Sequence, residues 1–121
     1  MEKVLGFGGF FFRAKDPEAL GKWYRDHLGI DLVPTDSAGK PWMAKGGATV
    51  FAPFEADTDY FARGKMFMVN FRVADLGAMC AQLENAGIET RSLGEVPGIG
   101  RFSHLNDPEG NAIELWEPHS D

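Results

Sequence analysis

The feature of this sequence that most constrains its fold is an internal repeat. Phe12-Arg-Ala-Lys-Asp16 in the first half and Phe71-Arg-Val-Ala-Asp75 in the second share the pattern Phe-Arg-x-x-Asp. Each stands just before an amphipathic stretch that ends in Leu-Gly-Ile or Ala-Gly-Ile. Repeated units of this kind bury their apolar faces against one another. We therefore expect two copies of one supersecondary unit.

Each copy predicts a helix with defined ends. Asp16 and Asp75 suit the N-cap position, where a side-chain oxygen accepts hydrogen bonds from the first turn. Pro17 fits the first helical position, and Gly29 and Gly87 fit the helix ends. Apolar residues at helical spacing give each helix a buried stripe: Leu20, Trp23, Tyr24 and Leu28 in the first, and Leu76, Met79, Cys80 and Leu83 in the second.

Short apolar runs between turn residues predict strands around both helices. The expected strands are 4–13, 30–34, 41–45 and 48–53 in the first half, and 66–73, 88–93, 101–105 and 112–117 in the second. The fold class is therefore α+β, with two βαβββ modules. A doubly wound sheet does not fit, because it needs more than one helix for every three strands.

The length of 121 residues predicts a single domain. It consists of modules 1–54 and 66–118, joined by an acidic connector, 55–65, that has no clear periodicity. The formal net charge of −6 argues against a nucleic-acid partner, which would need a basic face. A single cysteine excludes an internal disulfide.

The start of the chain lacks a basic region followed by a signal-type apolar stretch, and its longest uncharged run, 4–12, is too short to span a bilayer as a helix. We therefore expect a cytoplasmic protein with no membrane partner.

One carboxylate stands out near the end of the chain. Two apolar runs flank 106–111, a turn with proline early and glycine late, and this pattern predicts a β-hairpin. Glu114 lies inside the second run, Ala112-Ile-Glu-Leu-Trp116. A charge in an apolar strand is costly unless it faces water, a partner or a metal.

Three stretches make the chain resemble the vicinal oxygen chelate superfamily, which includes glyoxalase I, bleomycin-resistance proteins, epimerases and extradiol dioxygenases. They are 16–30, 71–75 and Asp107-Pro-Glu-Gly-Asn-Ala-Ile-Glu-Leu115, the last being the most recognisable signature. The resemblance covers nearly the whole chain. It implies that the curved mixed sheets of the two modules form an open barrel that encloses a cavity. It also implies that the protein is a homodimer.

The resemblance also implies where a metal would bind. In metal-dependent members each module gives one ligand from its first strand and one from its last. The corresponding positions here hold Gly9, Phe51, Met68 and Glu114, so only Glu114 matches a ligand position. A catalytic divalent metal usually takes at least three protein ligands. We therefore predict no cofactor, with an atypical divalent metal as the alternative.

Strand alternation extends the predicted cavity lining. If Met68 and its first-module counterpart face inward, then Phe11, Arg13, Asn70 and Arg72 share that face. By the resemblance, Arg13 matches an arginine that binds a substrate carboxylate in glyoxalase I-like proteins. A guanidinium that grips an anion bidentately suits that role. The alternative is that Arg13 pairs with a neighbouring acid.

Phe102 and His104 on the last hairpin resemble pocket-lining positions of the family. His104 is placed to face Glu114, and a His–Glu pair suits a general base with its orienting group. Its alternatives are a second ligand for an atypical metal, or a histidine hydrogen-bonded within the sheet. A further set of aromatic residues forms either a ligand wall or plain core: Trp42, Phe51, Phe67 and Trp116.

The sequence favours a small-molecule binding protein of the glyoxalase/bleomycin-resistance type. It would bind an apolar or aromatic ligand in the sheet cavity without a standard catalytic metal. The alternative is a glyoxalase-like lyase or isomerase, or a dioxygenase-type enzyme, acting through an atypical metal or an acid–base pair at Glu114 and His104.

Overall fold

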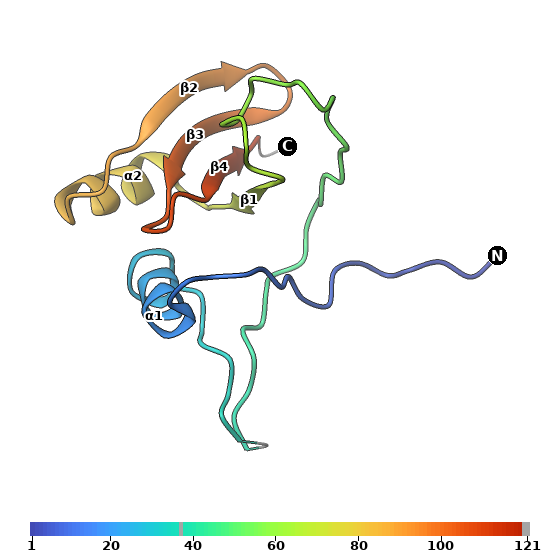
Figure 1. Cartoon of the computed structure of the whole chain (residues 1–121). Helices are drawn as coiled ribbons and strands as arrows, with labels where there is room; N and C mark the ends of the chain where they lie inside the picture. Colours follow the sequence, from blue (N-terminus) through green and yellow to red (C-terminus); the bar gives the residue numbers. More distant parts are fainter. Residues whose placement is uncertain (37, 120–121) are drawn as a thin grey trace. The chain divides into compact units, whose positions relative to one another are not determined.

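The computed structural model describes residues 1–36 and 38–119. The chain separates into two compact units, residues 1–56 and residues 57–121 (Figure 1). Among its described residues, the first unit contains one regular element, helix α1, Pro17–Leu28. Its ends are those predicted: the Asp16 side chain accepts a hydrogen bond from the Ala19 N–H at 3.1 Å, and Gly29 closes the helix with φ +72°.

The strands expected in the first unit, 4–13, 30–34, 41–45 and 48–53, are absent from its described residues. Those runs do not pair into a sheet, and several of their large side chains are exposed, with Phe11 94% and Phe51 80% accessible. A strand is defined by a paired neighbour, which an apolar run in the sequence does not specify. The two-module open barrel is therefore not confirmed; the fold observed is an α+β arrangement of one mixed sheet and two helices.

The second unit contains all four strands expected for it. They are β1 Met68–Arg72, β2 Arg91–Val96, β3 Gly100–Asn106 and β4 Ala112–Pro118, with helix α2 Leu76–Asn85 following β1. The sheet order is β1-β4-β3-β2, with β1 parallel to β4 and the other neighbours antiparallel (Figure 1). The chain thus places the strand that carries Glu114 in the interior of the sheet.

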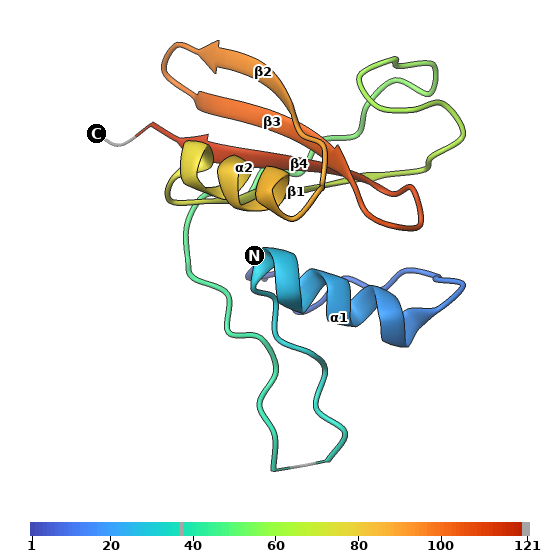
Figure 2. The ribbon, with the colours of Figure 1, turned by 90° about the vertical axis from the view of Figure 1, so that its left-hand side faces the viewer.

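Helix α2 lies across one face of this sheet (Figure 2). Asp75 caps its start by accepting from the Ala78 N–H, and Gly87 follows its end with φ +80°. The side chains buried most completely in this unit are Leu83 of the helix and Leu105, Ile113 and Leu115 of the sheet. Burial of these aliphatic side chains is the main source of the unit's stability.

Strand β2 starts three residues later than expected, at Arg91 rather than at 88. The Ile88 N–H donates to the Leu83 carbonyl at 2.9 Å, and the Glu84 carboxylate accepts from both the N–H and the hydroxyl of Thr90. These bonds hold 88–90 against the end of α2. Pairing with β3 therefore begins only at Arg91.

The predicted hairpin between β3 and β4 is confirmed. Asp107 is 4% exposed and organises the turn: one carboxylate oxygen accepts from the N–H groups of Glu109 and Asn111, and the other from the Asn111 amide. The strands it joins pair His104 directly opposite Glu114. Neither α1 nor α2, the helices of the described chain, has the length and apolar character needed to cross a membrane.

Gly100, at the start of β3, is a position where this register excludes a side chain. It has φ +143°, and a Cβ placed there would lie 2.2 Å from the Glu117 carbonyl oxygen and 2.7 Å from the Trp116 ring nitrogen. Gly100→Ala is expected to lower the free energy of unfolding by about 2 kcal/mol or more. Urea unfolding followed by circular dichroism measures this change.

Gly77→Ala is the matched control, because its Cβ would meet only the Asp75 side chain at an ordinary 3.6 Å. Alanine also suits a helix better than glycine does, so this variant should be neutral or gain up to about 1 kcal/mol. Equal stability of Gly100→Ala and wild type would contradict the observed β3–β4 register.

Candidate functional site

Four polar side chains form a row across the sheet of residues 57–121. The strand register places Asn70 of β1 beside Glu114 of β4, Glu114 opposite His104 of β3, and His104 opposite Arg91 of β2. Directly paired residues project from the same face of a sheet. The row therefore presents an amide, a carboxylate, an imidazole and a guanidinium side by side.

This row occupies the face of the sheet that α2 does not cover. The Cys80 thiol of α2 lies 3.5 Å from the hydroxyl of Ser103, which places Ser103 on the helix side. Successive residues of a strand point to opposite faces, so His104 and its paired neighbours point away from the helix. The site is built on a sheet whose opposite face packs in the hydrophobic core.

Glu114 is 6% exposed, and its carboxylate is surrounded by protein groups. Asn70 donates its amide to Oε1 at 2.7 Å, and His104 Nε2 lies 2.7 Å from Oε2. The hydroxyl of Tyr60 donates to the same Oε2. Each oxygen of a buried carboxylate needs such a partner, since an unpaired one costs free energy.

Tyr60 comes from the segment ahead of β1. Its ring stands edge-on to the His104 imidazole, with the two ring centroids 5.1 Å apart and an interplanar angle of 86°. Burial, the hydrogen bond to Glu114 and the negative charge of that carboxylate all raise the pKa of the Tyr60 phenol above its ordinary value. Tyr60 therefore stays a protonated donor to Glu114 at neutral pH.

The hydrogen bonds also assign the tautomer of His104. An ionised carboxylate can only accept, so Nε2 of His104 carries the proton that points at Glu114. In the neutral ring, Nδ1 is then the acceptor. This orientation of an imidazole by a buried carboxylate is the geometry that a general base requires.

Next to the polar row the same face carries an aromatic pair. Phe102 of β3 lies directly opposite Trp116 of β4, and their rings stack with centroids 6.1 Å apart and planes 3° from parallel. The Trp116 ring nitrogen donates to the Ile99 carbonyl at 3.1 Å, which fixes the indole. An apolar platform therefore adjoins the polar row.

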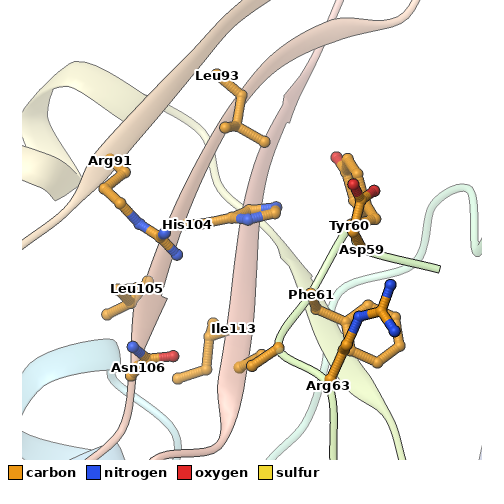
Figure 3. Close-up of a pocket in the computed structure, with 12 residues that line it drawn as sticks. Asp59, Tyr60, Phe61, Arg63, Arg91, Leu93, His104, Leu105, Asn106 and Ile113 are labelled. Carbon is orange, nitrogen blue, oxygen red and sulfur yellow. The ribbon is translucent and has the colours of Figure 1, made fainter. Parts of the chain in front are cut away.

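A cavity of about 530 Å³ opens beside His104 (Figure 3). The size suits a small organic molecule. Figure 3 shows His104 projecting from β3 toward Tyr60, with Arg91 on one side of the cavity and Asp59 and Arg63 on the other. The residues that line it are Asp59, Tyr60, Phe61, Ala62, Arg63, Arg91, Leu93, His104, Leu105, Asn106, Ala112 and Ile113.

The donors at this site do not fit a divalent metal. Both oxygens of Glu114 already accept hydrogen bonds from the protein, and Met68, at the predicted ligand position of β1, offers only a soft thioether. Over residues 1–36 and 38–119, no three His, Cys, Asp or Glu side chains are grouped so as to hold an ion. Of the roughly four lone-pair sites of this carboxylate, three already accept hydrogen bonds from Asn70, His104 and Tyr60.

The structure brings together three of the predicted site residues: Glu114, His104 and Asn70 make direct hydrogen bonds. Two other predicted site residues of unit 57–121 lie on β1 and β3. Met68 of β1 pairs with Ala112 of β4, and Phe102 of β3 stacks on Trp116. Arg72 also lies on β1, at an exposed position opposite Trp116.

Three further predicted residues, Phe11, Arg13 and Phe51, belong to unit 1–56. Their part in a ligand site stays a prediction.

Sequence reasoning missed Tyr60, Arg63 and Arg91. The first two lie in the segment interpreted as an acidic connector with no clear periodicity. Nothing in its pattern indicates that a tyrosine there reaches a residue 54 positions away. Arg91 lay inside the predicted strand 88–93, but a strand pattern does not state which residue of the neighbouring strand it pairs with. The pairing of Arg91 with His104 comes from the sheet itself.

Known structures share this fold. TnmS3, an antibiotic-binding protein from Streptomyces sp. CB03234, is 26% identical, with a TM-score of 0.57 over 87% of this chain and 88% of that one. A lactoylglutathione lyase from Agrobacterium tumefaciens is 19% identical, with a TM-score of 0.55 over 86% and 87% of the two chains.

A glyoxalase/bleomycin resistance protein from the same Streptomyces strain is 23% identical, with a TM-score of 0.58 over 86% and 93%. No curated protein sequence matches the chain. The model of the glyoxalase-like domain family, however, matches residues 9–116, which is most of the sequence. The chain therefore belongs to the glyoxalase-like domain family.

Proposed function

We propose that this protein binds a small apolar or aromatic molecule in the cavity beside His104 and does so without a standard catalytic metal. The observation that carries the proposal is the state of Glu114, whose carboxylate is held by Tyr60, Asn70 and His104. A carboxylate that accepts hydrogen bonds from three protein groups is held in one orientation within the polar row. A metal ligand would instead turn a lone pair toward an open coordination position.

The surroundings of the polar row support a binding role. The cavity lining combines apolar side chains such as Phe61 and Leu93 with a few fixed polar groups, the usual composition of a small-molecule site. TnmS3, at 26% identity over most of both chains, is described as an antibiotic-binding protein. A binding function is therefore consistent with the chemistry of the site and with that relative.

The cavity proposal is tested with naphthalene-2-carboxamide, a neutral probe with a planar apolar body, by isothermal titration calorimetry. Leu93 lines the cavity and is 46% exposed, so Leu93→Asp should fold normally. It sets a charge against the apolar probe and should weaken binding by about tenfold or more.

Val96→Asp is the matched control, because Val96 lies on the same strand, is 42% exposed and does not line the cavity. Its affinity for the probe should equal that of wild type. The proposal fails if wild type does not bind the probe, or if both variants lose it equally.

A second candidate function is that of a lyase or isomerase, and the buried His104–Glu114 pair favours it. The pair is 2.7 Å apart with both side chains 8% exposed, as expected for a base and its orienting group. The assay is formation or breakdown of S-lactoylglutathione, by analogy with the neighbour named lactoylglutathione lyase. Turnover by wild type that is lost in Glu114→Gln, while the probe still binds, would establish that the protein is an enzyme.

Metal removal separates the two functions further. If the cavity binds its ligand without a metal, dialysis against a chelator should leave the affinity for naphthalene-2-carboxamide unchanged. The reason is that the Glu114 carboxylate is held by hydrogen bonds from protein groups. Loss of probe binding after chelation, restored by a divalent metal, would contradict the metal-independent proposal and support the enzyme.

The hydrogen bond from Tyr60 to Glu114 is tested by its pH dependence. Because the pKa of Tyr60 is raised in the folded protein above the ordinary value of 10.0, its contribution to stability is complete below about pH 10 and is lost as pH rises further. The stability difference between wild type and Tyr60→Phe should therefore narrow between about pH 8 and about pH 11. Urea unfolding at both pH values measures it.

The control for this comparison is the same pair of proteins carrying Glu114→Gln. That background removes the hydrogen bond to a carboxylate and its charge, two of the causes that raise the pKa of Tyr60. In that background, the stability difference between the proteins with and without Tyr60→Phe should change less between the two pH values. An equal narrowing in both backgrounds would mean that Tyr60 and Glu114 are not coupled in solution.

A further inference from the structure

Two cationic side chains, Arg63 and Arg91, line the cavity together with the acid Asp59. On the segment ahead of β1, Arg63 and Asp59 bring opposite charges to the same side of the cavity. On the sheet, the charge of Glu114 is met by three donors. Arg91 of β2 lies on the side opposite Asp59 (Figure 3).

Among the described residues Arg91 has no acidic partner, and this is informative in a chain of this composition. The protein has 18 acidic and 12 basic residues, so carboxylates are plentiful. Arg101, on the neighbouring strand, pairs with Glu117 at 3.0 Å. Within the part of the chain that the structure describes, by contrast, the Arg91 guanidinium contacts no carboxylate.

The sheet holds Arg91 in a defined position. Its Cα pairs with His104, so the guanidinium extends the row of Asn70, Glu114 and His104 to the β2 side of the sheet. The register shift between Ser92 and Gly94 adds Leu93 as an extra residue next to it, and Leu93 also lines the cavity. A β-bulge commonly re-aims side chains in this way. Cationic and apolar groups are thus adjacent on one wall.

We propose that Arg91 is the anchor for an anionic group of the ligand, and that the bound molecule is an aromatic or apolar carboxylic acid. The carboxylate would accept two parallel hydrogen bonds from the planar guanidinium. The apolar body would lie against Leu93 and Phe61. This inference rests on the proposed binding function and specifies the chemistry of its ligand.

A pair of probes of nearly equal shape tests the anchor: naphthalene-2-carboxylate and naphthalene-2-carboxamide, titrated into the full chain by calorimetry. Wild type should bind the carboxylate about tenfold more tightly than the carboxamide. The preference should shrink as salt is added, because charge interactions are screened. Arg91→Gln should bind the two probes equally, because the charge that distinguishes the carboxylate from the carboxamide is gone.

Two further variants sharpen the result. Arg91→Lys keeps the charge but not the planar fork, so it should show an intermediate preference for the carboxylate. Arg101→Gln removes the same charge from β3 at a position that does not line the cavity, and it should keep the wild-type preference.

Equal binding of both probes by wild type would overturn the anchor while leaving the binding function intact. An undiminished preference in Arg91→Gln would overturn it as well. Failure of both probes to bind would overturn the proposed function and this inference together.

Discussion

A carboxylate buried on an interior strand must be surrounded by hydrogen-bond donors, and Glu114 imposes this requirement on the unit formed by residues 57–121. The neighbouring strands meet it with Asn70 and His104, and the segment ahead of β1 meets it with Tyr60. Each donor is held by a different element. The site therefore depends on the whole sheet being assembled in one register, since a slip of one residue would turn Glu114 into the core.

The two faces of this sheet divide stability from function. On one face, Leu83 of α2 packs with Leu105, Ile113 and Leu115 in the core. On the other, the polar row and the stacked pair of Phe102 and Trp116 adjoin a cavity. Strand alternation makes this division possible, because neighbouring residues of one strand serve opposite faces. Leu105 and Ile113 belong to both regions, since they are buried in the core and also border the cavity.

Local sequence signals predicted the helix ends and the turn of this fold. They failed for strands whose existence or start depends on pairing with another strand. The helix caps at Asp16 and Asp75 and the turn around Asp107 are set by side chains a few residues from the backbone groups they bind. The start of β2 was misplaced because the Glu84 carboxylate holds Thr90 at the helix end. The strands of the first half were predicted from apolar runs, but a run does not contain the partner that would make it a strand.

By itself, the sequence determined the family, the repeat, the helix ends and the importance of Glu114, because motifs and caps are local. It also placed His104 opposite Glu114 through the hairpin, since a turn fixes the register of the strands it joins. Only the tertiary structure decided that Tyr60 completes the shell of Glu114 and that Arg91 lies beside His104. Contacts between residues far apart in the chain depend on how the sheet is ordered, and the sequence pattern does not state that order.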